Sequence, residues 1–351
     1  MAEEQPPNQI AGAITYPQST NNENVQRPPR QPQNLQGLLR FAMEYTKRED
    51  APGESMLGPL DEERRRFLED ALKSLTVDVI EVLLKAINVL KGAGDLSLDT
   101  DISEYINAFE SILEFVDRID TAIDFYKIGG YDIFEPCFKC VHSQISANAC
   151  NLLAELCQNN PFCQDRALER GYIKTLIDLV AADKDAEIET SEVAVKAVYA
   201  LSCMIREHEN SLEEFTKQKG LEIFFQALQN NYCNNKLRIK ICFLLSALIN
   251  QNKDFQNQVV KMGFVPLFIS ILGEERNDVQ EHVLATLSSL VRSHRGAREE
   301  CQNPDYSLKA YLTSLLRMAV RLGDEALEIK EYCTELLSLF TEETTSNSVE
   351  R

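Results

Sequence analysis

The side chains that most often carry chemistry are sparse in this sequence and lie far apart. Four histidines are present in 351 residues, and none has a second histidine at the spacing of a helical metal pair: His142, His208, His282 and His294. His208 and His294 fall in polar turns between helical patterns, where a solvated or helix-capping role is usual. No phosphate-binding glycine loop or nucleophile elbow is present either. We therefore expect no enzyme activity and no cofactor.

The cysteines give no stronger signal. Cys137 and Cys140, with His142 nearby, resemble half of a zinc site, but no second pair at metal spacing completes it. Most of the ten cysteines lie inside helical patterns, as Cys150 and Cys157 do. We interpret them as reduced, buried, small apolar residues of a cytoplasmic protein.

Charge narrows the class of partner. The formal net charge is −19 and the pI is about 4.8, which argues against nucleic acid and anionic membranes, since both attract basic surfaces. The N-terminal residues lack the charged and apolar regions of a secretory signal, and no apolar run approaches the roughly 18 residues of a membrane span. The acidic composition fits a protein that binds a basic patch on a partner.

The elements that position these residues repeat along the chain. A short helical pattern, a break and a longer helical pattern recur at intervals of roughly 40 to 50 residues. Each unit has a glycine anchor: Gly130, Gly171, Gly220 and Gly263. Each long pattern ends in a polar turn: Asn160, Asn210, Asn252 and His294. This period is typical of three-helix armadillo repeats, so we predict an all-α, armadillo-like right-handed superhelix (an α-solenoid) of about four three-helix repeats with helical caps.

Composition predicts the boundaries between segments. They are a disordered N-terminal tail at 1–33, a short apolar motif at 34–47, a flexible linker at 48–60, an N-terminal helical cap at 61–128, armadillo-like repeats at 129–303, a C-terminal helical cap at 304–341 and an acidic tail at 342–351.

The long third helices normally line the concave face of such a fold, and their alignment makes that face readable. Peptide-binding armadillo proteins carry an asparagine ladder here, but the corresponding residues are Glu155, Cys203, Ala247 and Ser289. The missing ladder argues against binding of an extended peptide. Neighbouring positions on the same side give a candidate contact set of Asn148, Asn151, Lys196, Tyr199, Arg238, Lys240, Phe243 and His282.

Two interpretations of that set stay open. An aromatic pair, Tyr199 and Phe243, beside a basic row suits a protein–protein site on a folded acidic surface. The alternative is that both aromatic rings pack between repeats and that the lysines form a solvated helix start.

Several segments, in collinear order, carry a resemblance to a known family. They are NLQGLLRFA, LDEERRRFLEDAL, DTAIDFYKIGG, KLRIKICFLLSALI, QEHVLATLSSLV and REECQNPD. Together they resemble the armadillo-type nucleotide exchange factors of 70-kDa heat-shock chaperones. Residues 91–118 do not match, and an acidic insertion near 181–191 is a departure from the family pattern.

The resemblance implies a monomeric, cytoplasmic co-chaperone, with the nucleus as a second compartment. Its concave face would bind the nucleotide-binding domain of the chaperone, promote ADP release and so control client release, with inhibition when it is in excess. No nucleic acid, membrane or cofactor is implied. The alternative function is an armadillo scaffold or adaptor for another protein.

The apolar motif at 34–47 has two explanations. Leu35, Leu38, Leu39 and Ala42 form one helical stripe, which predicts a helix docked on the repeats. Its flexible flanks and the resemblance favour instead a tethered mimic of a client, one that competes for the chaperone's substrate-binding domain. The residues of this candidate mimic are Leu38, Leu39, Arg40, Phe41, Ala42 and Met43.

Overall fold

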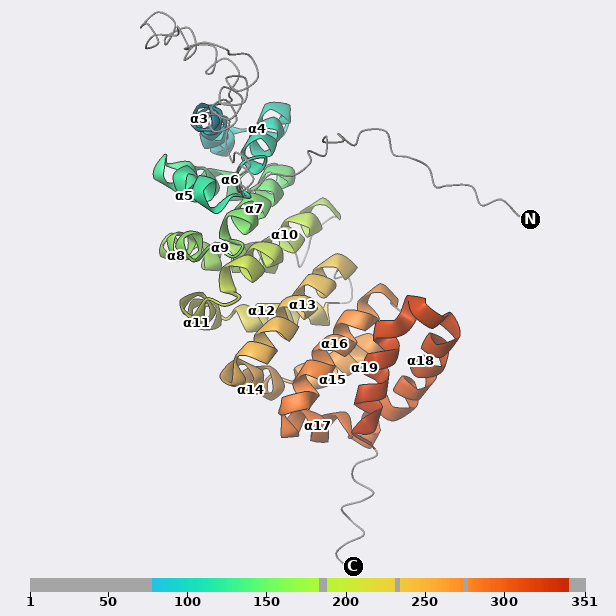
Figure 1. Ribbon diagram of the computed structural model, residues 1–351. Coiled ribbons are helices and arrows are strands. Elements are labelled where there is room, and N and C mark those ends of the chain that lie inside the picture. The colour runs from blue at the N-terminus through green and yellow to red at the C-terminus, as the bar shows by residue number, and fades with distance from the viewer. Residues whose placement is uncertain (1–77, 183–187, 231–233, 274–276, 341–351) are drawn as a thin grey trace, which may run out of the picture. The chain divides into compact units, whose positions relative to one another are not determined.

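The computed structural model describes residues 78–182, 188–230, 234–273 and 277–340, and every regular element in these ranges is a helix (Figure 1). These helices belong to one unit, Thr76–Arg351. The predicted N-terminal tail, apolar motif, linker and acidic C-terminal tail lie outside the described residues. Among the described helices, none alone is long and apolar enough to cross a membrane, and one pair, bent by 68°, meets the length and composition together.

The helices follow a repeating order of a short first, a second and a longer third helix. The unit opens with α3 (Val79–Leu90), η1 (Lys91–Asp95) and α4 (Ser103–Leu113). The next groups are α5 (Ile119–Lys127), η2 (Gly130–Ile133), α6 (Phe134–Phe138) and α7 (Ser143–Cys157), then α8 (Pro161–Glu169), α9 (Tyr172–Ala181) and α10 (Ile188–Ile205). They continue with α11 (Glu209–Lys217), α12 (Gly220–Gln229) and α13 (Asn235–Gln251), then α14 (Lys253–Lys261), α15 (Phe264–Leu272) and α16 (Asn277–Ser293). The last group is α17 (Arg295–Cys301), η4 (Pro304–Tyr306), α18 (Leu308–Leu322), η5 (Gly323–Ala326) and α19 (Leu327–Ser338).

A polar side chain caps the first helix of four successive groups. Asn160, His208, Asn252 and His294 each accept a hydrogen bond from the backbone N–H three residues later. Such a cap satisfies one of the N–H groups that a helix leaves without an internal partner. The turn after α10 is therefore marked by His208, and the predicted marker Asn210 lies inside α11. The capping role expected for His208 and His294 is confirmed.

The second helix of each group begins after a residue in the left-handed conformation. These residues are Gly129, Gly171, Lys219 and Gly263, with φ of 83°, 72°, 59° and 86°. The anchors predicted at Gly130 and Gly220 thus stand one residue past the left-handed position. They serve a different purpose, because a Cβ at either place would collide with an aromatic ring of the preceding helix, that of Phe125 or Phe215. Both kinds of constraint select glycine.

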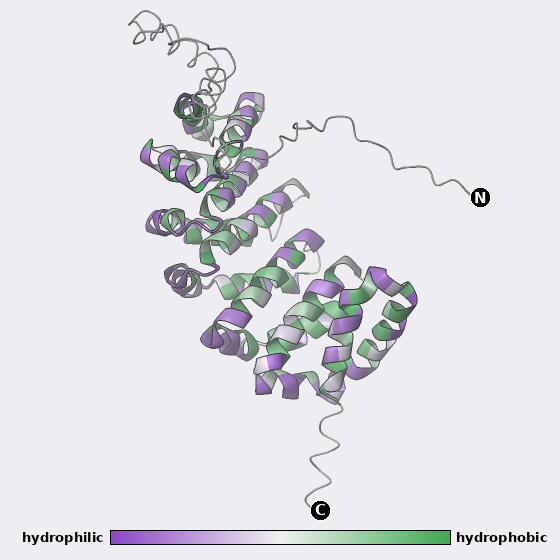
Figure 2. Ribbon diagram, viewed as in Figure 1, coloured by the Kyte–Doolittle hydropathy of each residue, from purple (hydrophilic) through white to green (hydrophobic). Residues whose placement is uncertain are grey.

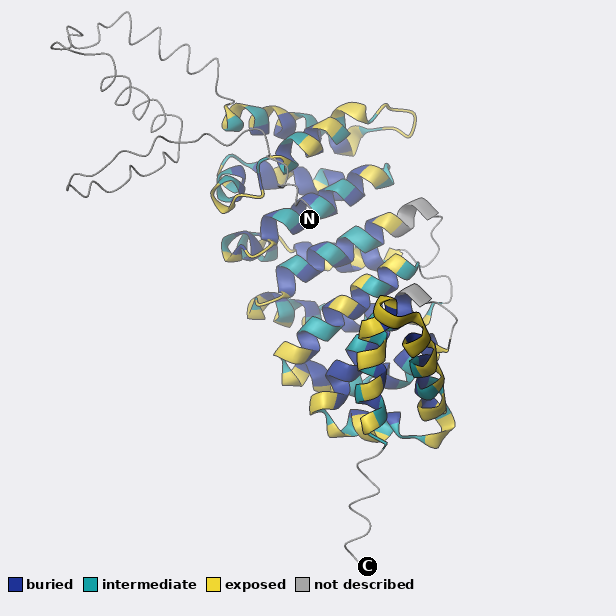
Figure 3. Ribbon diagram, turned by 45° about the vertical axis from the view of Figure 1, so that its right-hand side comes forward, coloured by how far each residue is buried: buried dark blue, intermediate teal, exposed yellow. Residues whose placement is uncertain are grey.

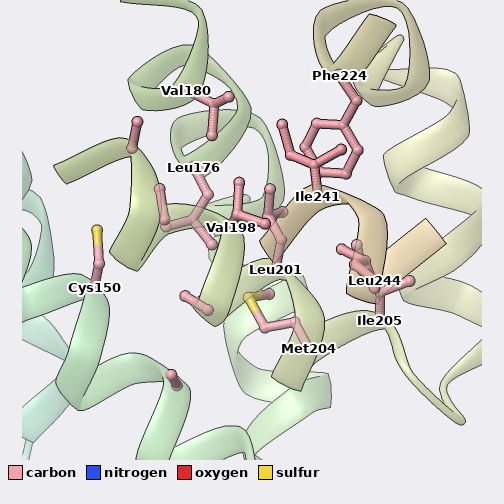
Figure 4. Packing of buried hydrophobic residues seen from close by; sticks show 14 of the residues in the cluster. Cys150, Leu176, Val180, Val198, Leu201, Met204, Ile205, Phe224, Ile241 and Leu244 are labelled. Atoms are coloured by element: carbon pink, nitrogen blue, oxygen red, sulfur yellow. The ribbon is translucent and has the colours of Figure 1, made fainter. Parts of the chain in front are cut away.

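The third helices form the centre of the unit. α4, α7, α10, α13, α16 and α19 contact one another in chain order (Figure 1). Apolar and polar residues alternate along them (Figure 2), as expected for helices that bury one side. In Figure 4, Val198 and Leu201 of α10 extend between Leu176 of α9 and Ile241 of α13, and all four are buried. Each such side chain contributes about 1.5–3 kcal/mol by leaving water.

The last helix, α19, is bonded to the preceding third helix, α16. Arg292 of α16 binds Glu335 of α19 through two hydrogen bonds, of 2.5 Å from Nε and 2.9 Å from Nη2. Exposed residues are frequent on α18 and α19 (Figure 3), as expected where no further helix follows within the described residues. Each helix thus has its neighbours on the same core, which is how a solenoid is stabilised.

Candidate protein-binding face

The third helices carry a set of partly exposed side chains that reach across from one helix to the next. We call this set the third-helix face, and it comprises Asn148, Asn151, Glu155, Lys196, Tyr199, Cys203, Arg206, Lys240, Phe243 and His282. It contains seven of the eight residues that the sequence predicts as contacts.

Two hydrogen bonds join α7 to α10 on this face. The Lys196 ammonium donates to Asn151 Oδ1 at 2.9 Å, and the Tyr199 hydroxyl donates to Glu155 Oε1 at 3.0 Å. Burial, followed by the neighbouring Cys203 and Glu155, raises the pKa of Tyr199, so the phenol stays neutral and remains a donor. The predicted neighbours on α7 and α10 are therefore in direct contact.

Two cation–π contacts join α10 to α13. Lys240 Nζ lies 5.0 Å from the ring centre of Tyr199, and Arg206 Cζ lies 5.6 Å from that of Phe243. Phe243 is 51% exposed, so it is not a core residue, while Tyr199 is half-buried and packs against the core. Tyr199 thus packs between repeats, whereas Phe243 does not, and contact of either ring with a partner stays a prediction.

The face is hollowed at two places. A pocket of ≈ 490 Å³ lies where Tyr199, Lys240 and Phe243 meet the turn after α7. A second pocket of ≈ 550 Å³ is bordered by Asn148 and Lys196. The contacts predicted from the sequence thus line depressions rather than a flat surface.

His282 continues the face on α16. Burial lowers its pKa; Glu328 on α19 opposes this and Lys240 reinforces it, so the imidazole is neutral at neutral pH. The adjacent Glu281 has a raised pKa, first through burial and then through its hydrogen bond to Glu328. Burial at the end of the face next to α19 therefore disfavours the charged forms of both side chains.

Arg238 corrects the predicted contact set. Its side chain is fully buried, and Nη2 donates at 2.9 Å to the carbonyl of Asn230, the C-cap residue directly after α12. A cation at a helix C-terminus is favoured by the carbonyl groups left open there. Arg238 therefore stabilises the repeat and does not reach the third-helix face.

Three side chains of the third-helix face were not among the predicted contacts. Arg206, Glu155 and Cys203 all border the face, and a signal for them existed. Glu155 and Cys203 occupy the positions of the missing asparagine ladder, and Arg206 follows Cys203 by three residues, which keeps it on the same side of α10.

Other predicted features lie away from this face. The candidate client mimic, Leu38 to Met43, falls outside the described residues. Cys137 and Cys140 are free thiols, and the described ranges hold no cluster of three metal-ligating side chains.

Two family comparisons match consecutive parts of the chain. Residues 35–125 match the family described as nucleotide exchange factor Fes1, and residues 121–258 match the SIL1/FES1/HPBP1 C-terminal domain. The second match contains α7, α10 and α13, the helices that carry most of the third-helix face. The chain belongs to this family of exchange factors. The resemblance seen in the sequence is confirmed.

Individual relatives agree with this family assignment. The chain is 29% identical over 333 residues to Hsp70-binding protein 1 of Mus musculus, across 92% of this chain and 90% of the relative. It is 27% identical over 204 residues to the Hsp70 nucleotide exchange factor FES1 of Saccharomyces cerevisiae, across 56% of this chain and 68% of that protein.

Solved structures confirm the fold of this family member. A designed armadillo repeat protein superposes with a TM-score of 0.56 at 12% identity, over 73% of this chain and 99% of the other. A computationally designed armadillo repeat protein for modular peptide recognition gives the same values. The predicted armadillo-type α-solenoid is therefore correct.

Proposed function

We propose that this co-chaperone exchange factor binds the nucleotide-binding domain of a 70-kDa heat-shock chaperone through its third-helix face. The observation that carries the proposal is the overlap between the C-terminal family domain, residues 121–258, and the helices that present this face. A scaffold with a polar, hollowed surface is suited to binding.

Binding alone accounts for exchange. If the open form of the chaperone holds ADP poorly, a protein that binds the open form better than the closed form weakens the affinity for ADP. ADP in turn weakens the chaperone's affinity for that protein by the same factor. ADP then leaves, ATP enters and the client is released. When the exchange factor is in excess, it holds the chaperone in the open form and inhibits the cycle. No group of this protein needs to touch the nucleotide.

The rate of ADP release tests the proposal. A fluorescent ADP analogue is loaded onto the purified chaperone and its release is followed by stopped flow, with and without this protein. Acceleration that saturates with the protein's concentration is expected. No acceleration at saturating protein contradicts the proposal.

The cations of the face give a second prediction. In the double variant Lys196→Glu/Lys240→Glu, two charges on the face are reversed, and we expect chaperone binding to weaken by about 10-fold or more. The matched control is Lys174→Glu/Lys217→Glu, on the short helices α9 and α11, which changes the net charge equally. Equal affinities of the two double variants, measured by calorimetry, would place the contact elsewhere.

The effect of ATP on partner capture distinguishes an exchange factor from an adaptor for another protein. Protein immobilised in lysate is expected to capture the 70-kDa chaperone and to lose it when ATP is added. Capture of a different partner, unchanged by ATP, is the outcome expected of an adaptor.

We further propose that the protein is a cytoplasmic monomer. The nine cysteines of the described ranges are all free thiols, which supports a reducing compartment. Size-exclusion chromatography with light scattering checks the monomer, and fractionation checks the compartment.

A further inference from the structure

The ≈ 490 Å³ pocket between α10 and α13 has an unusual wall. α10 with the turn that follows it, and α13, each contribute one ring and one cation, and each cation lies over the ring from the other side: Lys240 of α13 over Tyr199 of α10, and Arg206, directly after α10, over Phe243 of α13. Stacking on a ring restricts a long side chain that would otherwise be free to rotate. The two cations are therefore held at fixed places on the rim.

Neither cation is neutralised within the described part of the chain. No carboxylate there lies within ion-pair distance of Lys240 or Arg206, whereas Lys174 and Lys217, for example, each have one. Glu155, the acid of the third-helix face, is bonded to the Tyr199 hydroxyl. In a protein with a formal net charge of −19, two unpaired cations at one pocket form a local positive site.

The floor of the pocket is polar but uncharged. Burial raises the pKa of Cys203 to about 11, and Glu155 adds to this, so the residue is present as a thiol. Gln164 of α8 donates at 2.8 Å to the carbonyl of Cys203, which fixes the floor to the neighbouring helix. Glu207 stands on the rim, exposed, in a left-handed turn after α10.

We propose that this pocket receives a carboxylate side chain of the chaperone's nucleotide-binding domain, held between Lys240 and Arg206 beside the exposed ring of Phe243. The inference rests on the proposed function and names the chemistry of the contact. An arginine offers a carboxylate two parallel hydrogen bonds, and a lysine adds a point charge. The rest of this acidic protein repels a carboxylate, so charge complementarity selects the pocket.

Two substitutions that remove the positive charges test the inference. In Arg206→Gln/Lys240→Gln, both cations are lost while a polar, unbranched side chain is retained, and we expect binding to the purified nucleotide-binding domain to weaken by about 10-fold or more. The conservative variant Arg206→Lys/Lys240→Arg retains both charges but moves the guanidinium to the other position, so it is expected to lose less affinity than the glutamine variant. The matched control is Lys174→Gln/Lys217→Gln.

The outcomes separate this inference from the proposed function. If the unmodified protein binds and the glutamine variant binds equally well, the inference is overturned and the proposed function stands. If the unmodified protein does not bind, the proposed function fails first. Circular dichroism of each variant shows whether it is folded, and the conservative variant supplies the comparison if the glutamine variant is not.

A coupling experiment identifies the occupant. A carbodiimide joins a lysine amine to a touching carboxylate as an amide, with loss of water to the reagent. In the complex, we expect Lys240 to be joined to an aspartate or glutamate of the nucleotide-binding domain, as located by mass spectrometry. Coupling of Lys240 only to acids of its own chain, with or without the chaperone, overturns the proposal.

Discussion

At the scale of single residues, Arg238 and Lys240 show how two cations on one helix take opposite roles. Lys236 and Lys240 are four residues apart and share the exposed side of α13, whereas Arg238 lies between them and points into the repeat. Arg238 is fully buried and bonded to Asn230, while Lys240 is exposed over Tyr199. Net charge along a stretch of sequence therefore says little about which cation meets a partner.

The buried cation gives a prediction about stability. Arg238→Ala leaves the carbonyl of Asn230 without this donor and opens a cavity, so we expect the free energy of unfolding to fall by about 3 kcal/mol. Lys236→Ala, on the exposed side, is expected to change it by less than about 0.5 kcal/mol. Urea unfolding measures both. A loss of chaperone affinity in Arg238→Ala without a loss of stability would restore Arg238 to the contact set.

At the scale of elements, the start of α12 departs from its counterparts. Lys219 has the left-handed conformation that glycine supplies before η2, α9 and α15. A side chain in this conformation is strained by roughly 1 kcal/mol because its Cβ crowds the backbone. The residue is kept in place by the structure around it and not by its own preference.

Relief of this strain is predicted to stabilise the protein. Lys219→Gly is expected to raise the midpoint of urea unfolding. The relieved strain exceeds the cost of the added entropy of the unfolded chain, so the free energy of unfolding is expected to rise by about 0.5 kcal/mol. Lys219→Ala retains the strain and is expected to give no gain. Gly220→Ala, one residue on, is expected to destabilise, because its Cβ meets the ring of Phe215. A gain from both Lys219 variants would argue for a lost contact of the lysine instead.

How much of the fold was predictable follows from the same elements. The spacing of apolar residues predicts the repeat of three helices, because every stacked helix must bury one apolar side. The architecture could therefore be predicted from the sequence. The register of the turns was not, because Gly130 and Gly220 satisfy a steric limit set by distant rings, whereas Gly171 and Gly263 satisfy a backbone angle. A glycine in a sequence does not reveal which of these it serves.

The face was predictable in outline for a similar reason. Helical periodicity places Asn151, Tyr199 and Phe243 on one side of their helices, whatever the partner. Contacts between helices are a different matter. The exchange of rings and cations between α10 and α13 depends on how far one helix is shifted along the other, which no single helix encodes.

At the scale of the whole molecule, the contact between α16 and α19 holds the last helix to the repeats. Arg292, and then Ser288, lower the pKa of Glu335, although burial opposes them. Because the folded pKa lies below its ordinary value of 4.5, this contribution is present above that pH and is lost as pH falls through the lowered value.

This contact predicts a pH-dependent effect. Glu335→Gln is expected to lower the free energy of unfolding by about 0.5 kcal/mol at neutral pH, since the pair is partly exposed. At about pH 3.5 the difference from the unmodified protein is expected to shrink, because the carboxylate is then being protonated. A difference that is constant across this range would assign the effect to packing rather than charge. Thermal unfolding at both pH values provides the measurement.

The apolar motif at 34–47 also belongs to this scale, since it concerns two binding events by one chain. We propose that Leu38 to Met43 acts as a tethered client mimic on the substrate-binding domain of the chaperone. Deletion of residues 1–50 is then expected to leave ADP release intact and to slow the release of a bound client peptide. Client release as fast as before, with intact ADP release, would favour a helix docked on the repeats.

The buried thiols make this protein its own reporter of local opening. Cys150, Cys163 and Cys242 lie in three successive helical groups, Cys301 and Cys333 lie in the last group, and all five are buried. Burial raises the pKa of Cys150 above its usual range and that of Cys301 to about 12, so in the closed state these sulfurs are both covered and protonated. A thiol-labelling reagent added in a pulse can therefore reach each one only when its own group of helices opens. Labelling rates resolved by peptide would give the frequency of local opening in each group of helices. They would also show in which groups opening becomes rarer when the chaperone is bound.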